Sequence, residues 1–281
     1  MKKVGIVACS NALKPEDRKE VQKLLSLLEN TGRQPQLSSC IFSGDGPLAG
    51  TGRQRAEELM KLFSDPEIGE IYDISGGDLA NEVLDFLDFE DIARSRAQLW
   101  GYSDLTSVIN AIYARTGKSS VLYSVRNLLY SEERRQQYCR EPEKLLAPSF
   151  RMLRGTSMEG IVAGGNVRCL LKLAGTPYFP DMEGKLLLME ARSGKVPQMI
   201  AYLSQLRSCG VFEKINGILL GTFTQMEAEG CRPDMGTLVK SFAGPELPIA
   251  VTEEIGHGRN SRGIRIGQWM RISSESESAC G

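Results

Sequence analysis

Residues 98–113 read Gln-Leu-Trp-Gly-Tyr-Ser-Asp-Leu-Thr-Ser-Val-Ile-Asn-Ala-Ile-Tyr, and the hydrophobic pattern changes partway along this stretch. The run from Gln98 to Tyr102 has the apolar character of a buried strand. From Leu105 to Tyr113, apolar residues recur at the spacing of a helix. The stretch therefore predicts a strand, a sharp turn and a helix.

The same order of elements repeats through the first half of the chain. Strands are predicted at 3–9 and 68–74, and helices at 21–28, 53–63 and 79–88. Alternation of this kind is typical of a mostly parallel sheet that is covered by helices on both faces. We therefore expect residues 1–140 to form a doubly wound α/β domain.

The alternation stops in a polar stretch between Tyr123 and Gly155, which contains Pro142 and Pro148. We expect a linker at 141–159 and a smaller, β-rich α/β domain at 160–272. Its strands are predicted at 185–190, 215–222, 249–252 and 264–272, and its helices near 167–173 and 197–209. Residues 273–281 are rich in serine and glutamate, so we expect a disordered tail there.

Composition excludes several classes of function. The 281 residues include 34 basic and 35 acidic side chains, so the chain lacks the positive charge of a nucleic-acid or membrane-surface protein. Its apolar runs are far shorter than the roughly 20 residues of a membrane span, and the six-residue run near the N-terminus is short for a secretion signal. We expect a cytoplasmic protein.

Metal and cofactor motifs are also missing. The seven cysteines are widely scattered and the chain has 1 histidine, so the usual zinc ligand sets are not available. No phosphate-binding loop or dinucleotide fingerprint occurs. We therefore expect no metal and no cofactor.

Ser103 occupies the predicted turn between strand and helix. A serine at such a turn projects from the carboxyl edge of the sheet, and the free N–H groups of the helix stabilise negative charge there. This geometry is that of a nucleophile elbow. The Gly-Xaa-Ser-Xaa-Leu sequence is incomplete for that motif, however, and Ser103 with Asp104 could instead cap the helix.

His257 and Glu190 could serve such a nucleophile. His257 lies between two glycines on a predicted loop, where a side chain is accessible, although a loop histidine can also be a solvated bystander. Glu190 ends an apolar strand, so its carboxylate either is paired or begins the next loop in water. Ser103, Glu190 and His257 all lie at predicted strand ends, in the order nucleophile, acid, base.

Two further features could contact a ligand. Gly76 and Gly77 follow a strand at the same sheet edge as Ser103, so their backbone could approach a ligand and Gly77 could donate to an oxyanion. Arg259 lies two residues after the histidine and could hold a substrate carboxylate. With Arg262 and Arg265 it could equally belong to a solvated face.

In these residues the chain resembles the LD-carboxypeptidase family of serine peptidases, which includes muramoyltetrapeptide carboxypeptidases and microcin C immunity peptidases. The resemblance runs from Val4 to about Ile272. It rests on 52–59 before 65–68, 75–78 with Asn81 and 87–88, 101–104, 164–166, the strand ending in Glu190, and 256–258. The chain departs from the family pattern at Asp78-Leu79 and at Ala191-Arg192-Ser193.

The resemblance implies an N-terminal domain similar to class I glutamine amidotransferases, a β-rich C-terminal domain, and a catalytic triad between them. By motif, Ser103 would be the nucleophile, His257 the general base and Glu190 its orienting carboxylate. The backbone N–H groups of Asp104 and Gly77 would bind the oxyanion, and Gly76 and Arg259 would contact substrate. The resemblance also implies a homodimer.

We therefore expect a serine carboxypeptidase of peptidoglycan recycling that hydrolyses the L,D bond and releases terminal D-alanine from a murein tetrapeptide. An immunity-type amidase that cleaves a peptidyl-nucleotide antibiotic is an alternative that composition does not separate. A noncatalytic, two-lobed ligand-binding protein is another. A cysteine amidotransferase would need a thiol where this chain has Ser103.

Overall fold

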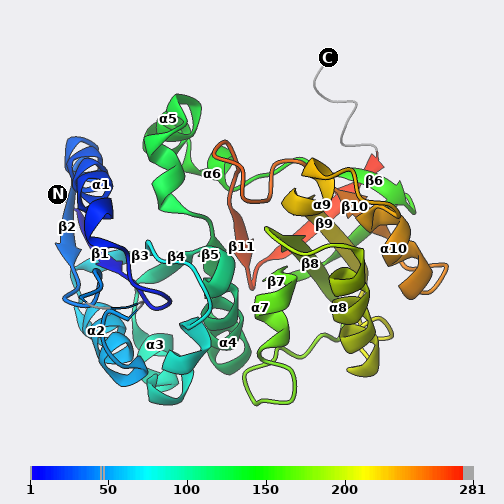
Figure 1. Cartoon of the computed structure of the whole chain (residues 1–281), viewed down its shortest axis with the longest axis horizontal. Helices are drawn as coiled ribbons and strands as arrows, with labels where there is room; N and C mark the ends of the chain where they lie inside the picture. Colours follow the sequence, from blue (N-terminus) through cyan, green and yellow to red (C-terminus); the bar gives the residue numbers. More distant parts are fainter. Residues whose placement is uncertain (1, 45, 47, 275–281) are drawn as a thin grey trace.

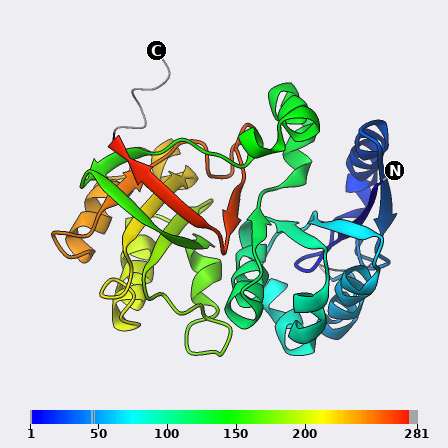
Figure 2. The same cartoon turned by 180° about the vertical axis from the view of Figure 1, so that it is seen from behind.

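The computed structural model describes residues 2–44, 46 and 48–274, which form two lobes lying side by side (Figures 1 and 2). Each lobe is built around a six-stranded sheet. The chain is therefore a two-domain α/β protein.

The N-terminal sheet has the strand order β11-β5-β4-β3-β1-β2. Its parallel strands are β1 (Lys2–Val7), β2 (Arg33–Leu37), β3 (Ile68–Asp73), β4 (Gln98–Gly101) and β5 (Ser120–Leu122). Its helices are α1 (Arg18–Asn30), α2 (Gly52–Ser64), α3 (Phe89–Arg94) and α4 (Thr106–Thr116). The predicted alternation of strands and helices is thus confirmed for this half.

The C-terminal sheet has the order β12-β7-β8-β9-β10-β6. Parallel strands form its centre, namely β7 (Ser157–Asn166), β8 (Lys185–Ala191), β9 (Gly217–Phe223) and β10 (Ile249–Val251). The antiparallel edge strands are β6 (Arg151–Arg154) and β12 (Trp269–Ser273). The helices are α7 (Val167–Leu171), α8 (Val196–Ser208), α9 (Thr224–Ala228) and α10 (Met235–Phe242).

Several boundaries differ from those the sequence predicts. The expected linker at 141–159 contains α6 (Pro142–Leu145), β6 and the start of β7, and it follows α5 (Glu132–Arg140). The predicted helix at 79–88 is a 3-10 helix, η2 (Ala80–Phe86). Ser273 belongs to β12 and the Ser274 N–H donates to the Thr156 carbonyl at 3.0 Å, whereas 275–281 lie outside the described residues.

The predicted strand at 264–272 is two strands in different sheets. The first, β11 (Ile264–Ile266), pairs antiparallel with β5 in the N-terminal sheet, and β12 then pairs with β7 in the C-terminal sheet. Gly267 separates them with a φ of +84°, which residues other than glycine rarely adopt. The last part of the chain therefore ties the two sheets together.

A shared core also joins the domains. One apolar cluster contains Ile109 of α4 together with Val162 of β7 and Leu188 of β8, all fully buried. Beside it, the Asn110 side-chain amide donates to the Gly164 carbonyl at 2.9 Å and accepts from the Gly164 N–H at 2.8 Å. These contacts therefore hold the carboxyl edges of the two sheets in fixed positions relative to one another.

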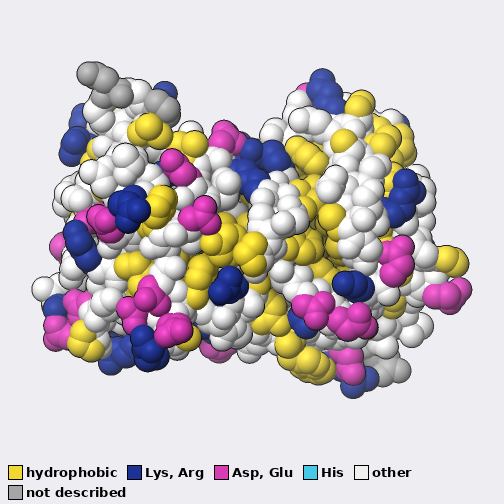
Figure 3. Space-filling view, turned by 90° about the horizontal axis from the view of Figure 1, so that it is seen from below, with side chains coloured by type: hydrophobic (Ala, Val, Ile, Leu, Met, Phe, Trp, Pro, Cys, Tyr) yellow, Lys and Arg dark blue, Asp and Glu magenta, His cyan; other side chains and the backbone are white. Residues whose placement is uncertain are grey.

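The distribution of side chains on the surface agrees with the two-domain fold. Seen from below, apolar side chains gather along the middle of the molecule together with a few basic ones, and further charged side chains lie to either side (Figure 3). None of the helices in the described ranges combines the length and apolar character that a membrane crossing requires.

Candidate active site

Ser103 lies at the tip of the turn between β4 and α4. Its φ of +57° makes it the only non-glycine residue with positive φ in the described part of the chain. Such a backbone conformation is strained, and it persists where the surrounding structure enforces it. Gly101 permits the turn, because a Cβ there would lie 2.8 Å from the Leu105 Cβ.

His257 contacts both Ser103 and Glu190. Its Nε2 lies 3.2 Å from the Ser103 Oγ, and its Nδ1 lies 2.8 Å from the Glu190 Oε2. The serine hydroxyl and the carboxylate thus lie at the two different nitrogens of one imidazole ring. The structure therefore brings the three predicted residues together in the order that a general-base mechanism requires.

Glu190 is fully buried near the end of β8, and each of its oxygens lies close to a polar side chain. Oε2 faces the imidazole, and Oε1 accepts a hydrogen bond from the Asn166 Nδ2 at 2.9 Å. Asn166 ends β7, and its own N–H donates to the Thr106 Oγ1 at 3.0 Å. Asn166 thus orients the carboxylate as well as capping α7.

The Tyr102 ring packs edge-on against the His257 ring, with 5.1 Å between centroids. Burial raises the pKa of the Tyr102 phenol well above its ordinary value, and the nearby Glu190 carboxylate raises it further. The neutral Tyr102 ring therefore excludes water from one side of the imidazole. The sequence gives no signal for this contact, because it depends on the packing of two domains.

The loop that carries His257 is tightly held. A Cβ at Gly256 would lie 1.8 Å from the Thr222 Oγ1, so only glycine fits there. The Ser261 Oγ donates to the Gly256 carbonyl at 2.7 Å. From α5, the buried Arg134 donates through Nε to the Asn260 carbonyl at 3.1 Å. Contacts from both domains therefore fix the position of His257.

The predicted oxyanion donors lie on two loops that are bonded to one another. Gly77 has a φ of +132°, and a Cβ there would lie 2.3 Å from the Asn11 side chain. The buried Asp104 side chain accepts from the Ala80 N–H at 2.8 Å, which joins the loop after β3 to the serine turn. A Cβ at Gly76 would meet nothing within 4 Å, so Gly76 faces open space.

Arg259 differs from its two arginine neighbours. Arg262 pairs with Glu254 at 3.0 Å, and Arg265 binds Glu143 through two contacts of 2.8 and 2.9 Å. The exposed Arg259 guanidinium lies 4.3 Å from the centre of the Tyr130 ring and forms no salt bridge with any described residue.

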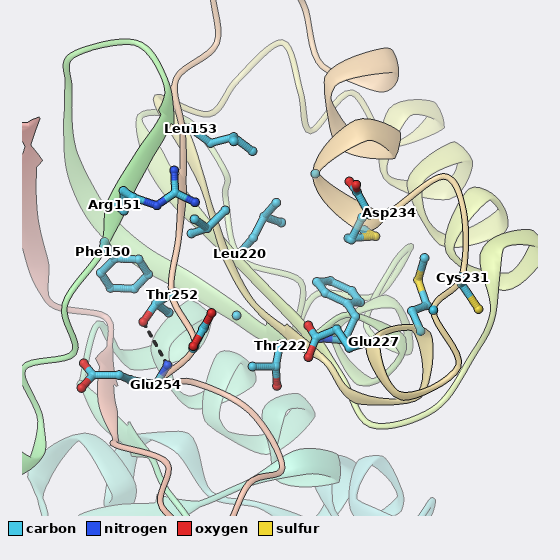
Figure 4. A pocket seen from close by; sticks show the side chains of 18 of the residues that line it. Phe150, Arg151, Leu153, Leu220, Thr222, Glu227, Cys231, Asp234, Thr252 and Glu254 are labelled. Atoms are coloured by element: carbon cyan, nitrogen blue, oxygen red, sulfur yellow. Dashed lines mark hydrogen bonds between the residues drawn. The ribbon is translucent and has the colours of Figure 1, made fainter.

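A cavity of about 970 Å³ lies elsewhere in the C-terminal domain (Figure 4). Its lining includes Leu220 and Thr222 of β9 and Arg151 of β6, but neither Ser103 nor His257. In the described ranges, no group of three or more His, Cys, Asp or Glu side chains could hold a metal ion. The six cysteines described are free thiols.

Comparison with known families agrees with this architecture. Residues 4–123 match the model of the LD-carboxypeptidase N-terminal domain, and residues 159–272 match that of the LD-carboxypeptidase C-terminal domain. The Bacillus subtilis strain 168 protein named "Probable murein peptide carboxypeptidase" is 30% identical over 244 residues, covering 78% of this chain and 72% of that protein. The murein tetrapeptide carboxypeptidase of Pseudomonas aeruginosa is 26% identical, covering 95% and 91% of the two chains.

Solved structures share the fold at lower identity. The MccF-like protein of Bacillus anthracis superposes with a TM-score of 0.83 at 22% identity, covering 99% of this chain and 94% of the other. The muramoyltetrapeptide carboxypeptidase of Oxalobacter formigenes has a TM-score of 0.79 at 19% identity, covering 97% and 95%. The resemblance seen in the sequence is confirmed, and the chain belongs to the LD-carboxypeptidase family.

Proposed function

We propose that this protein is a serine carboxypeptidase that releases terminal D-alanine from a murein tetrapeptide by hydrolysing the L,D amide bond. The observation that carries the proposal is the pair of contacts made by His257, with the Ser103 Oγ at 3.2 Å and with Glu190 at 2.8 Å. Relatives named murein peptide and murein tetrapeptide carboxypeptidase support the choice of substrate.

In the first half of the reaction, the His257 Nε2 removes the Ser103 proton as Oγ attacks the carbonyl carbon. The N–H groups of Asp104 and Gly77 hold the oxyanion of the tetrahedral intermediate. When the intermediate collapses, the imidazolium gives its proton to the amine of the departing D-alanine. The rest of the peptide remains as an ester on Ser103.

In the second half, water attacks the ester carbonyl while His257 accepts one of the water protons. The same N–H groups stabilise the second tetrahedral intermediate. Its collapse breaks the bond to the Ser103 Oγ, which takes the proton back from the imidazolium. Glu190 stabilises the imidazolium in both halves without taking the proton itself.

Gly76 and Arg259 would contact the substrate. Gly76 presents bare backbone to open space at the loop after β3, and the Arg259 guanidinium forms no salt bridge with a described residue, although it interacts electrostatically with Glu20. The substrate carries carboxylates, so Arg259 is suited to bind one of them. We also propose that the protein works in the cytoplasm, as expected from its sequence, and that it is a homodimer, as its family resemblance implies.

A second candidate function is cleavage of a peptidyl-nucleotide amide. The Escherichia coli microcin C7 self-immunity protein MccF is 23% identical to this chain, covering 82% and 78% of the two. A solved structure holds MccF with glutamyl sulfamoyl guanosine and superposes with a TM-score of 0.82 at 20% identity. The same triad could hydrolyse either amide. The residues around the triad would therefore decide between the two functions.

The test presents wild-type protein with three substrates of equal concentration and follows the products by mass spectrometry. These are a murein tetrapeptide ending in D-alanine, the same peptide ending in L-alanine, and an aminoacyl sulfamoyl adenosine. The proposal predicts fast release of D-alanine and at least about tenfold slower release of L-alanine. Faster cleavage of the nucleotide conjugate would establish the second function instead.

A further inference from the structure

Asp104 follows the nucleophile directly, and its carboxylate has no exposed surface. Oδ2 accepts hydrogen bonds from the Ser10 Oγ at 2.6 Å and from the Ala80 N–H at 2.8 Å. The Ser10 Oγ in turn accepts from the Leu79 N–H at 3.2 Å. One buried carboxylate therefore binds the loops after β1 and β3 to the serine turn.

The remaining oxygen of this carboxylate contacts the other domain. Lys172, just after α7, forms an ion pair with the Asp104 Oδ1, and its side chain is only 18% exposed. The same ammonium donates to the Asp78 carbonyl at 2.8 Å. Lys172 thus holds the serine turn and the segment after Gly77 at once.

The ion pair matters because a buried carboxylate without a counter-charge is costly. Within the described residues, Lys172 is the one cation at salt-bridge distance from Asp104. Arg168 lies one helical turn earlier, but its Nη2 donates to the Gly77 carbonyl at 3.0 Å and its Nη1 pairs with Asp78. Both cations of this segment therefore reach across the domain boundary to the glycine loop.

We propose that Lys172 is a positioning residue for the oxyanion hole: its ammonium holds Asp104 and the Asp78 carbonyl so that the N–H groups of Asp104 and Gly77 converge beside the Ser103 Oγ. The C-terminal domain would then complete the oxyanion hole as well as supply His257 and Glu190. This inference rests on the proposed function only in using these two N–H groups as the oxyanion donors.

The test measures the second-order rate at which a fluorophosphonate phosphonylates Ser103. This reaction uses the activated serine and the oxyanion hole but needs no peptide substrate. Lys172→Met should slow labelling about 10- to 100-fold, because small displacements of catalytic groups cost rate on this scale. An unchanged rate would overturn the proposal, as would a wild-type protein that is not labelled.

A double-mutant cycle shows whether Lys172 acts through Asp104. If it does, Asp104→Asn should slow labelling to a similar degree, and the double variant should be no slower than the slower single variant. If instead the two reductions in labelling rate multiply in the double variant, Lys172 and Asp104 act independently. That result would overturn the proposal. Lys172→Arg, which keeps the charge, should recover a rate within about threefold of wild type.

Two controls separate positioning from loss of stability. Lys195→Met removes the exposed Lys195–Glu229 ion pair of the C-terminal domain and should leave labelling unchanged. Leu203→Ala opens a cavity in the apolar core beneath α8 and should destabilise the fold without slowing labelling of the folded fraction. If Leu203→Ala slows labelling as much as Lys172→Met does, the effect is structural and the proposal fails.

Failure of the proposed function would look different. In that case the wild-type protein would be labelled at Ser103 but would release no D-alanine from the tetrapeptide, and the Lys172 effect on labelling would persist. Should Lys172→Met not fold, Lys172→Gln removes the charge while retaining a donor for the Asp78 carbonyl. The same slowing is then expected, and a wild-type rate would overturn the proposal.

Discussion

Glu190 is the last residue but one of β8 and follows four apolar residues, and none of its surface reaches solvent. At this position a carboxylate is tolerated because Asn166 donates to Oε1 and the His257 Nδ1 lies 2.8 Å from Oε2. The arrangement explains how the protein fixes the imidazole so that Nε2 faces Ser103. The chemistry that we propose for the triad therefore depends on Glu190.

Replacing Glu190 with Gln keeps its shape but removes the charge that stabilises the imidazolium. We expect kcat on the murein tetrapeptide to fall about 10³- to 10⁴-fold with little change in KM. Steady-state kinetics measure this, with Glu183→Gln as a control because Glu183 is an exposed glutamate in the same domain. A Glu190→Gln enzyme within tenfold of wild type would remove Glu190 from the mechanism.

Asp73, at the end of β3, supports the glycine loop. It accepts hydrogen bonds from the Cys9 N–H and the Ser75 N–H, both at 2.7 Å. Burial raises the pKa of its carboxyl from 3.8 to about 6. The folded chain therefore holds this proton more tightly than the unfolded chain, so protonation favours folding.

This stabilisation is complete below about pH 4 and disappears as the pH rises through about 6. Compared with Asp73→Asn, which stays neutral, the wild type should lose up to about 3 kcal/mol of unfolding free energy between pH 4 and pH 7. Urea titrations of both proteins across this range measure the difference. A difference that does not change with pH would contradict the shifted pKa of Asp73.

Among the elements, the loop after β3 tolerates little change at Gly77. Gly77 has positive φ and lies against Asn11, so Ala there would be strained and would also clash. Gly69, within β3, has neither constraint, because a Cβ there would meet nothing within 4 Å. The two glycines form a matched pair for testing the loop.

We expect Gly77→Ala to lower kcat about 10- to 100-fold because the displaced N–H no longer meets the oxyanion. Gly69→Ala should leave kcat within about twofold of wild type. Kinetics with the murein tetrapeptide compare them, and circular dichroism verifies that both are folded. Equal activity of the two variants would exclude Gly77 as an oxyanion donor.

The elements also show what sequence patterns can and cannot predict. Strands and helices with a clear period were predictable, and so was the turn at Ser103, because each depends on neighbouring residues. The division of 264–272 between two sheets was not predictable, since it depends on partners far away in the chain. Likewise, Asn166 could be predicted as a helix cap, but its contact with Glu190 could not.

At the scale of the whole molecule, the shared apolar core makes the two domains depend on each other. The cluster joins α4 to β7 and β8, and the Asn110 amide links the same elements. Because the proposed catalytic residues come from both domains, relative motion of the domains would separate Ser103 from His257. A stable interface is thus a condition of activity.

The domains should therefore unfold together. The chain has two tryptophans: Trp100 in β4 of the N-terminal sheet and Trp269 in β12 of the C-terminal sheet. Fluorescence of Trp269→Phe and Trp100→Phe then reports each domain alone, and both should show one urea midpoint after correction for any shift that circular dichroism reveals. Two separate midpoints would show that the domains unfold independently.

The central claim is that Ser103 is the nucleophile that releases D-alanine, and the most direct measurement compares wild type with Ser103→Ala on a murein tetrapeptide. Mass spectrometry follows D-alanine, with Ser204→Ala on α8 as a control serine. We predict release by wild type and Ser204→Ala, and at least about 10⁴-fold slower release by Ser103→Ala. Release by Ser103→Ala at a rate close to that of wild type would contradict this account.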